Sequence, residues 1–224
     1  MERLLDQELD RTRQDLLRMG GLVEQMIGDA MRALIDRDTD LARGVVMADE
    51  GIDRLEKQLD EECHSILARL QPTAVDLRLL VSAMKINKDL ERMGDSAVNI
   101  AQGVEILNGE PPLKPYIDLP RMAGQVRQMV ARSLDAFAHK DAALAREVCE
   151  SDDEIDALYH QLFRELLTYM IEGPGNVSRA LQLLLIARNL ERIADHATNV
   201  AEDVIYYVLG QDIRHSPRTE KAKR

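Results

Sequence analysis

The stretch from residue 86 to residue 101 reads INKDLERMGDSAVNIA, and it returns one hundred positions later as IARNLERIADHATNVA. Two unrelated amphipathic helices share spaced apolar positions by chance, but they do not share their polar positions. Here the polar positions recur as well, and this marks an internal repeat. The matched polar residues are Glu91, Arg92, Asp95 and Asn99 in the first copy and Glu191, Arg192, Asp195 and Asn199 in the second.

The repeat extends into the preceding part of each copy. Residues 18–53 match residues 121–156 at an offset of 103, so that Asp38 and Asp49 return as Asp141 and Asp152. The offset falls from 103 to 100 further along, so the second copy is three residues shorter between these stretches. The chain therefore divides into a first unit, 1–108, a Pro-rich linker, 109–117, a second unit, 118–210, and a basic tail, 211–224, which we expect to be disordered.

Apolar residues recur at helical spacing along nearly the whole chain, and the alternation typical of strands is absent. The breaks in this pattern are short, and short connections make consecutive helices antiparallel. Thr73, with Asp76 three positions later, resembles a capping box at the start of one helix. The prediction is an all-α protein of two tandem, pseudo-symmetric three-helix bundles, with helices at 4–37, 40–69, 73–107, 118–139, 141–171 and 176–209.

The composition fits such a bundle and narrows the classes of function. Hydrophobic residues make up 45% of the 224 residues and aromatic residues only 3%, which predicts an aliphatic core. The net charge is −11, and the basic patch of a nucleic-acid-binding surface is missing outside the tail, so we expect no nucleic-acid partner. The start of the sequence is charged, no apolar run could span a bilayer, and the two cysteines lack metal-type spacing. We therefore expect a cytoplasmic protein that meets a membrane only through partners.

On the second and third helices of each unit, carboxylates stand four residues apart. Like charges at this spacing repel each other and weaken a helix. Asp53 lies 19 positions before the turn near residue 72 and Glu91 lies 19 after it, so antiparallel helices bring them level. Asp156 and Glu191 match to within one position about the turn near residue 174. We predict two clusters of four carboxylates and one amide, with Asp49, Asp53, Glu91, Asp95 and Asn99 in the first and Asp152, Asp156, Glu191, Asp195 and Asn199 in the second.

Clustered carboxylates without a cation repel one another, and an all-oxygen cluster suits hard cations such as Mg²⁺, Mn²⁺, Ca²⁺ or ferric iron. A competing explanation is that Arg92 and Arg192 neutralise the carboxylates as ordinary surface ion pairs. The duplication of the polar pattern and the level pairing across both hairpins favour a metal site.

Other chemical motifs are weaker. Glu61 and His64 have the Glu-x-x-His spacing of di-iron bundles, but the second unit has no equivalent histidine, and such sites need two copies. His160 and His196 neighbour the carboxylate rows without a counterpart in the first unit, which is typical of solvated polar positions. No Gly-rich phosphate loop, nucleophile elbow or Cys-His pair is found.

Residues 71–78 (QPTAVDLR), 85–101 and 187–202 resemble the signature of the PhoU family, and the resemblance covers residues 1 to 210. It implies a six-helix, pseudo-twofold bundle whose Glu/Asp-x-x-x-Asp motifs bind multinuclear metal clusters, often of iron. These motifs correspond to Asp49/Asp53, Glu91/Asp95, Asp152/Asp156 and Glu191/Asp195. The second copy carries Ala194 where the family often has Gly, a change that suits a helix interior.

The resemblance also implies a role. PhoU-like proteins are negative regulators of the phosphate-starvation response, and they restrain high-affinity phosphate uptake. The implied partners are the ATPase of a phosphate ABC transporter and a phosphate-sensing histidine kinase, with the protein acting as a homodimeric adaptor rather than an enzyme. The alternative that stays open is a metal-storage or metalloenzyme bundle, in which the carboxylate clusters themselves do the chemistry.

Overall fold

The chain folds into six long helices, as the computed structural model shows for residues 2–214, with side chains described from Leu4 onward. All six lie within a few residues of their predicted positions, and the described residues contain no strand, so the all-α prediction is confirmed. Residues 215–224, most of the predicted basic tail, lie outside the described residues. The helices are α1 (Glu2–Asp36), α2 (Thr39–Leu70), α3 (Ala74–Asn108), α4 (Asp118–His139), α5 (Ala142–Glu172) and α6 (Val177–Leu209), with a short 3-10 turn, η1 (Pro174–Asn176), before α6.

The second helix of each unit begins with the same cap. The Asp38 side chain accepts a hydrogen bond from the backbone N–H of Leu41, and Asp141 accepts from the N–H groups of Ala143 and Leu144. An aspartate at this position satisfies N–H groups that have no partner within the helix. The two hairpins α1–α2 and α4–α5 therefore turn in the same way.

The capping box predicted at Thr73 is wrong. The Thr73 side chain makes no capping hydrogen bond, and the N–H of Asp76 bonds to the backbone oxygen of Thr73 at 3.1 Å instead. Ala74 has a left-handed backbone conformation, with φ of 48°, so the chain enters α3 through a backbone turn.

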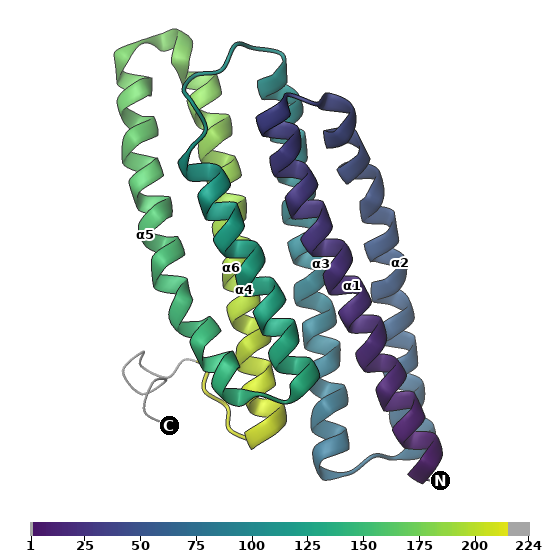
Figure 1. The fold of residues 1–224 in the computed structure, drawn as a ribbon. Coiled ribbons are helices and arrows are strands. Elements are labelled where there is room, and N and C mark those ends of the chain that lie inside the picture. The colour runs from purple at the N-terminus through teal and green to yellow at the C-terminus, as the bar shows by residue number, and fades with distance from the viewer. Residues whose placement is uncertain (1, 215–224) are drawn as a thin grey trace.

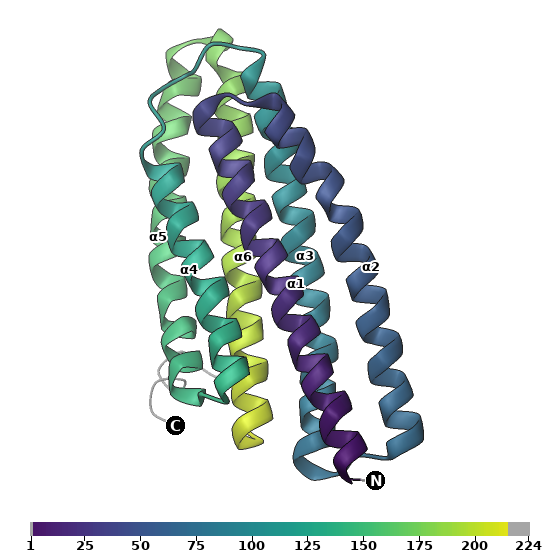
Figure 2. The same ribbon diagram turned by 45° about the vertical axis from the view of Figure 1, so that its right-hand side comes forward.

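The two units lie side by side, with α3 and α6 packed together in the middle (Figure 1). α1 also contacts α4, whereas α2 and α5 lie at opposite outer edges, as the turned view shows (Figure 2). Small residues allow the central helices to approach closely, since a methyl group added at Gly103 would lie 3.3 Å from Ile186 Cγ1. Because α3 and α6 are the central pair, polar residues on their exposed sides face a seam between the units.

The core is aliphatic, as predicted, with one aromatic contact between Phe137 and Tyr207 at 6.0 Å between ring centroids. A polar link joins the units inside the bundle, where Lys85 Nζ lies 2.8 Å from the Asp203 carboxylate and the Ser82 hydroxyl donates to the Asp203 backbone oxygen. None of the described helices is both long enough and apolar enough to cross a membrane.

Candidate metal clusters and the groove between them

The first predicted cluster assembles between α2 and α3. Asp49 lies against Gly94, where an added methyl group would come within 3.4 Å of Asp49 Oδ1. Burial raises the pKa of Asp49 to about 6, with further contributions from Asp53, Asp95 and Glu91 in that order. All four carboxylates that the register count aligned therefore influence one another.

The second cluster assembles between α5 and α6 in the same way. Glu191 is only 9% exposed, and its pKa is raised by burial and by the charges of Asp195, Asp156 and Asp152. The pKa of Asp195 is raised too, by burial first and then by Asp156. The structure thus brings together the four predicted carboxylates of this unit as well.

The amides of the predicted clusters are placed differently from the carboxylates. Asn199 lines the seam between α3 and α6, with its Nδ2 3.5 Å from Asp89 Oδ1. Asn99 and Asn199 are both exposed. The amides therefore lie at the surface of α3 and α6, and the contact with Asp89 places Asn199 beside the seam.

The cations nearest the clusters are not the arginines of the competing explanation. Lys88 Nζ lies 3.1 Å from Glu91 and 3.2 Å from Glu56, and Arg188 pairs with Glu191. Arg92 and Arg192 form no ion pair with any residue that the structure describes. Surface ion pairs do occur at both clusters, but the cation is Lys88 or Arg188, three positions before Glu91 or Glu191.

The donor set fits a hard cation. Glu191 Oε2 is buried and has no hydrogen-bond partner among the described residues, which leaves a carboxylate oxygen that a cation would satisfy. No three His, Cys, Asp or Glu side chains between residues 4 and 214 already surround one point. An ion would therefore be held after rotation of exposed aspartates such as Asp95 and Asp195.

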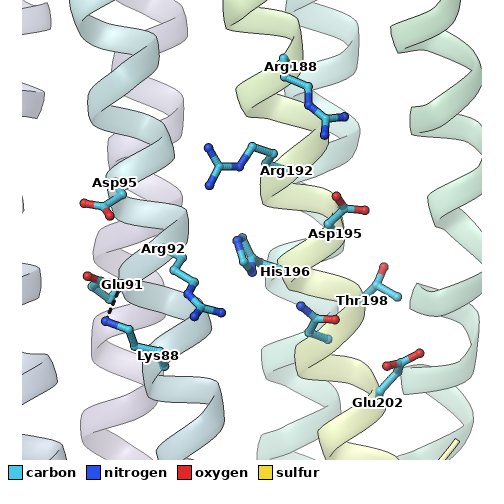
Figure 3. A pocket seen from close by; sticks show the side chains of 11 residues that line it. Lys88, Glu91, Arg92, Asp95, Arg188, Arg192, Asp195, His196, Thr198 and Glu202 are labelled. Carbon is cyan, nitrogen blue, oxygen red and sulfur yellow. Dashed lines mark ion pairs between the residues drawn. The ribbon is translucent and has the colours of Figure 1, made fainter. Parts of the chain in front are cut away.

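A groove of about 890 Å³ runs between α3 and α6, flanked by the two carboxylate clusters (Figure 3). Its lining contains four permanent cations. In Figure 3, Arg92 and Arg192 point into the space between the two helices, and His196 lies beside them. The lining residues are Lys88, Glu91, Arg92, Asp95, Arg188, Arg192, Asp195, His196, Thr198, Asn199 and Glu202.

This groove was not predicted from the sequence. It depends on how the two units pack against each other, and the register count within one hairpin carries no such information. A signal was present nonetheless, because Lys88 and Arg92 recur as Arg188 and Arg192 at the offset of the carboxylates.

His64 and His160 are exposed, but the expectation that His196 is a solvated polar position is wrong, because its side chain is only 13% exposed. His64 Nδ1 lies 2.7 Å from the backbone oxygen of Asp60 in its own helix. His196 Nδ1 lies 2.8 Å from Asp89 Oδ1 across the seam, which ties α6 to α3.

Two carboxylate clusters on a pair of fused three-helix bundles define a class of duplicated, acidic helical proteins. The PhoU domain model matches residues 16–104 and residues 119–204 separately, one match for each unit. The chain belongs to the PhoU family.

Relatives and solved structures agree with this assignment. The PhoU homolog of Pseudomonas putida, a phosphate-specific transport system accessory protein, is 49% identical over 93% of this chain and 82% of its own length. That of Aquifex aeolicus is 44% identical over 98% of this chain and 99% of its own. The crystal structure of PhoU from Pseudomonas aeruginosa superposes with a TM-score of 0.89 at 46% identity, covering 92% of this chain and 99% of that one. The phosphate transport system regulatory protein PhoU from Streptococcus pneumoniae gives 0.86 at 30% identity, covering 93% and 98%.

Proposed function

We propose that this protein is a negative regulator of the phosphate-starvation response and a modulator of high-affinity phosphate uptake. It acts as a cytoplasmic adaptor between the ATPase of a phosphate ABC transporter and a phosphate-sensing histidine kinase. The observation that carries the proposal is the similarity, over nearly the whole chain, to relatives named as phosphate-specific transport system accessory proteins. Similarity to the Streptococcus pneumoniae protein, which is named a phosphate transport system regulatory protein, supports the same direction.

An exposed apolar surface supports the adaptor role. Two rows of side chains spaced four residues apart run along α5 and α6 and stand level about the turn that joins these helices. Each side chain is at least 42% exposed. Contiguous apolar surface of this kind marks sites of protein–protein contact. We name it the α5–α6 strip, formed by Phe163, Leu167, Ile171, Val177, Leu181 and Leu185.

The first unit keeps part of the apolar row on α3, with Leu77 and Val81, but it lacks the row on α2. Phe163 and Leu167 correspond to Asp60 and His64, at the offset of 103. A partner that recognises apolar helical faces would therefore bind the second unit. We propose that a partner protein binds this strip. The homodimer implied by the family resemblance would form through other helical faces of the protein.

The carboxylate clusters have a place in this proposal. They would hold hard cations, with iron favoured by the family resemblance and Mg²⁺, Mn²⁺ or Ca²⁺ as further candidates. A bound cation would offset part of the four clustered negative charges and join α2 to α3, or α5 to α6, across each hairpin. The protein's own contribution is to set the carboxylates level on antiparallel helices.

The test is alkaline phosphatase output in phosphate-replete cells with the gene intact, deleted and restored. We expect constitutively high output on deletion and a return to low output on restoration. Unchanged output on deletion would contradict the regulatory role.

A matched pair of variants separates the strip from the rest of the surface. Leu167→Glu with Leu181→Glu should fail to restore repression, because charges replace the apolar contact. His64→Glu, at the equivalent position of the first unit, should restore it fully. Equal behaviour of the two would contradict the role of the strip.

The doubled clusters also favour a second candidate function, metal storage or metal-dependent catalysis. In that case, redox or phosphatase activity should rise with metal loading of the purified protein and fall when the clusters are substituted. The adaptor proposal expects neither activity.

A further inference from the structure

The groove between α3 and α6 has an unusual arrangement of charges. Four cationic side chains line it, and they form two pairs of equivalent residues, Lys88 with Arg188 and Arg92 with Arg192. Lys88 turns toward Glu91, and Arg188 turns toward Tyr159 of α5. Arg92 and Arg192, in contrast, point toward each other across the seam (Figure 3). The groove therefore lies on the pseudo-twofold axis that relates the units.

The acidic residues of the lining do not occupy the centre. In Figure 3, Asp95 and Glu91 turn away from the groove on the α3 side, and Asp195 and Glu202 turn away on the α6 side. Arg92 and Arg192 lie between these two sets. The overall charge of the lining is mixed, but its centre is cationic.

The two central guanidinium groups lie in no close ion pair with a described residue, although the charge of Arg192 offsets a little of the rise that burial causes in the pKa of Asp195. Neither Arg92 nor Arg192 forms a side-chain hydrogen bond or an ion pair with another described residue, whereas Lys88 and Arg188 are held by Glu91 and Glu191. A pair of guanidinium groups presents planar, rigid sets of donors suited to a tetrahedral oxyanion. Such an anion has equivalent faces, so it can meet two symmetry-related arginines at once.

The surroundings supply a further polar donor and link the two helices that carry the arginines. Asn199 lines the groove beside the arginines, and its amide lies near Asp89. The contact of His196 with Asp89 at 2.8 Å links α6 to α3 beside the arginines. The arginines therefore stand on two helices that are packed together and joined by a polar contact.

We propose that this groove is a binding site for a tetrahedral oxyanion, held between Arg92 and Arg192. The choice of inorganic phosphate as the anion rests on the proposed function. The site itself rests on the charges and geometry of the groove, and it is distinct from the carboxylate clusters that flank it.

The experiment is a titration of the full-length chain with inorganic phosphate, followed by calorimetry and by broadening of the ³¹P resonance of phosphate. The protein is used both as purified and after treatment with a chelator. Saturable binding to one site per chain is expected in both forms, because the arginines and not a metal make the site.

Substitution of the arginines gives the decisive comparison. Arg92→Gln or Arg192→Gln should weaken phosphate binding roughly ten- to hundred-fold, the usual effect of losing charge-assisted hydrogen bonds. Arg92→Lys keeps the charge but not the paired donors, so its loss should be smaller. Arg54→Gln is the control, since Arg54 is an exposed residue of α2 outside the groove.

Several results would overturn the proposal. They are the absence of saturable phosphate binding, equal binding by the arginine variants and the control, or binding that is lost only when the carboxylates are substituted. Binding of an acidic peptide but not of phosphate would also overturn it, in favour of a partner's carboxylates. The titration does not involve gene regulation, so its failure and the failure of the phosphatase assay are told apart directly.

Discussion

The two carboxylate clusters occupy equivalent places in the two units, yet their charges are balanced differently. In the first cluster, burial and three neighbouring carboxylates raise the pKa of Asp49 to about 6. In the second, Arg188 partly offsets the charges that raise the pKa of Glu191 and of Asp195. The first cluster therefore has the greater excess of negative charge.

One substitution between the units accounts for much of this difference. Glu56 in α2 corresponds to Tyr159 in α5 at the offset of 103. In the first unit, Lys88 is shared between Glu56 and Glu91. In the second, Arg188 lies 5.8 Å from the centroid of the Tyr159 ring and pairs with Glu191. The charge balance of a duplicated carboxylate motif can thus differ between its copies through a residue outside the motif.

The largest effect we expect is the loss of cation binding at the first cluster. Asp49→Asn with Asp95→Asn should weaken the tighter class of Mn²⁺ sites by at least about a hundred-fold, since direct ligands contribute more than the outer-shell partners that alone cost roughly 10–100-fold. Calorimetric titration of chelator-treated protein measures it. Asp152→Asn with Asp195→Asn makes the equivalent substitutions in the second cluster and should remove only the weaker class of Mn²⁺ sites.

This prediction depends on a difference in Mn²⁺ affinity between the two clusters. If the two double variants lose sites of equal Mn²⁺ affinity, the difference in charge balance has no consequence for metal binding. If neither changes the metal content of the protein, the clusters are not metal sites.

The next effect tests the role of Arg188. Arg188→Gln should tighten Mn²⁺ binding at the second cluster by roughly ten-fold, because a cation beside Glu191 competes with the metal, and screened charges a few ångströms apart interact by about 1–4 kcal/mol. The same titration measures it. Lys88→Gln should tighten the first cluster less, since Lys88 is shared with Glu56.

The third effect concerns pH. The pKa of Asp49 is raised by folding, so the native state binds its proton more readily than the unfolded state does. The stability that this proton contributes is complete below about pH 4, and it is lost as pH rises through about 6. Asp49→Asn should therefore stabilise the metal-free protein by ~1 kcal/mol at pH 8, a value lowered by solvent screening of a partly exposed group, and by nothing at pH 4.

Chemical denaturation at the two pH values measures this effect. Glu50→Gln, an exposed neighbour on α2, serves as control and should change stability little at either pH. A gain from Asp49→Asn that is the same at pH 4 and pH 8 would mean that packing, and not charge, is responsible.

The extent to which the sequence predicted these features follows from the range of the interactions. Helix positions depend on local periodicity, and the level pairing of Asp53 with Glu91 depends only on a short turn between rigid helices. Both can be counted along the chain. The all-α architecture was therefore predicted correctly. The four carboxylates of each unit lie close enough to influence one another's pKa values, while their role as metal sites stays a prediction.

Features that depend on packing between distant segments were missed. The groove needs the positions of α3 and α6 relative to each other, which side chains far apart in sequence decide. The linker is also held by distant contacts, as Arg37 donates to the backbone oxygens of Asn108 and Glu110. The cap at Thr73 failed for a local reason, because the backbone turn at Ala74 has a conformation that a residue pattern does not reveal.

The smallest effect concerns the residue beneath the first cluster. Gly94 lies against Asp49 in the first unit, whereas Ala194, fully buried, occupies the equivalent position in the second. An added methyl at Gly94 would lie 3.4 Å from Asp49 Oδ1 and from Ile52 Cγ2, which is ordinary contact. Gly94→Ala should therefore stabilise the protein by about 0.5–1 kcal/mol, the gain in helix propensity.

The reverse exchange completes the comparison of the units. Ala194→Gly should destabilise the protein by about 1.5–2 kcal/mol, because it loses helix propensity and a buried methyl group. Thermal denaturation of the two variants and of the protein carrying both measures whether the exchanges add. If Gly94→Ala instead destabilises the protein, Asp49 needs the open space beside α3, and the glycine belongs to the first cluster as a residue that makes room for its carboxylate.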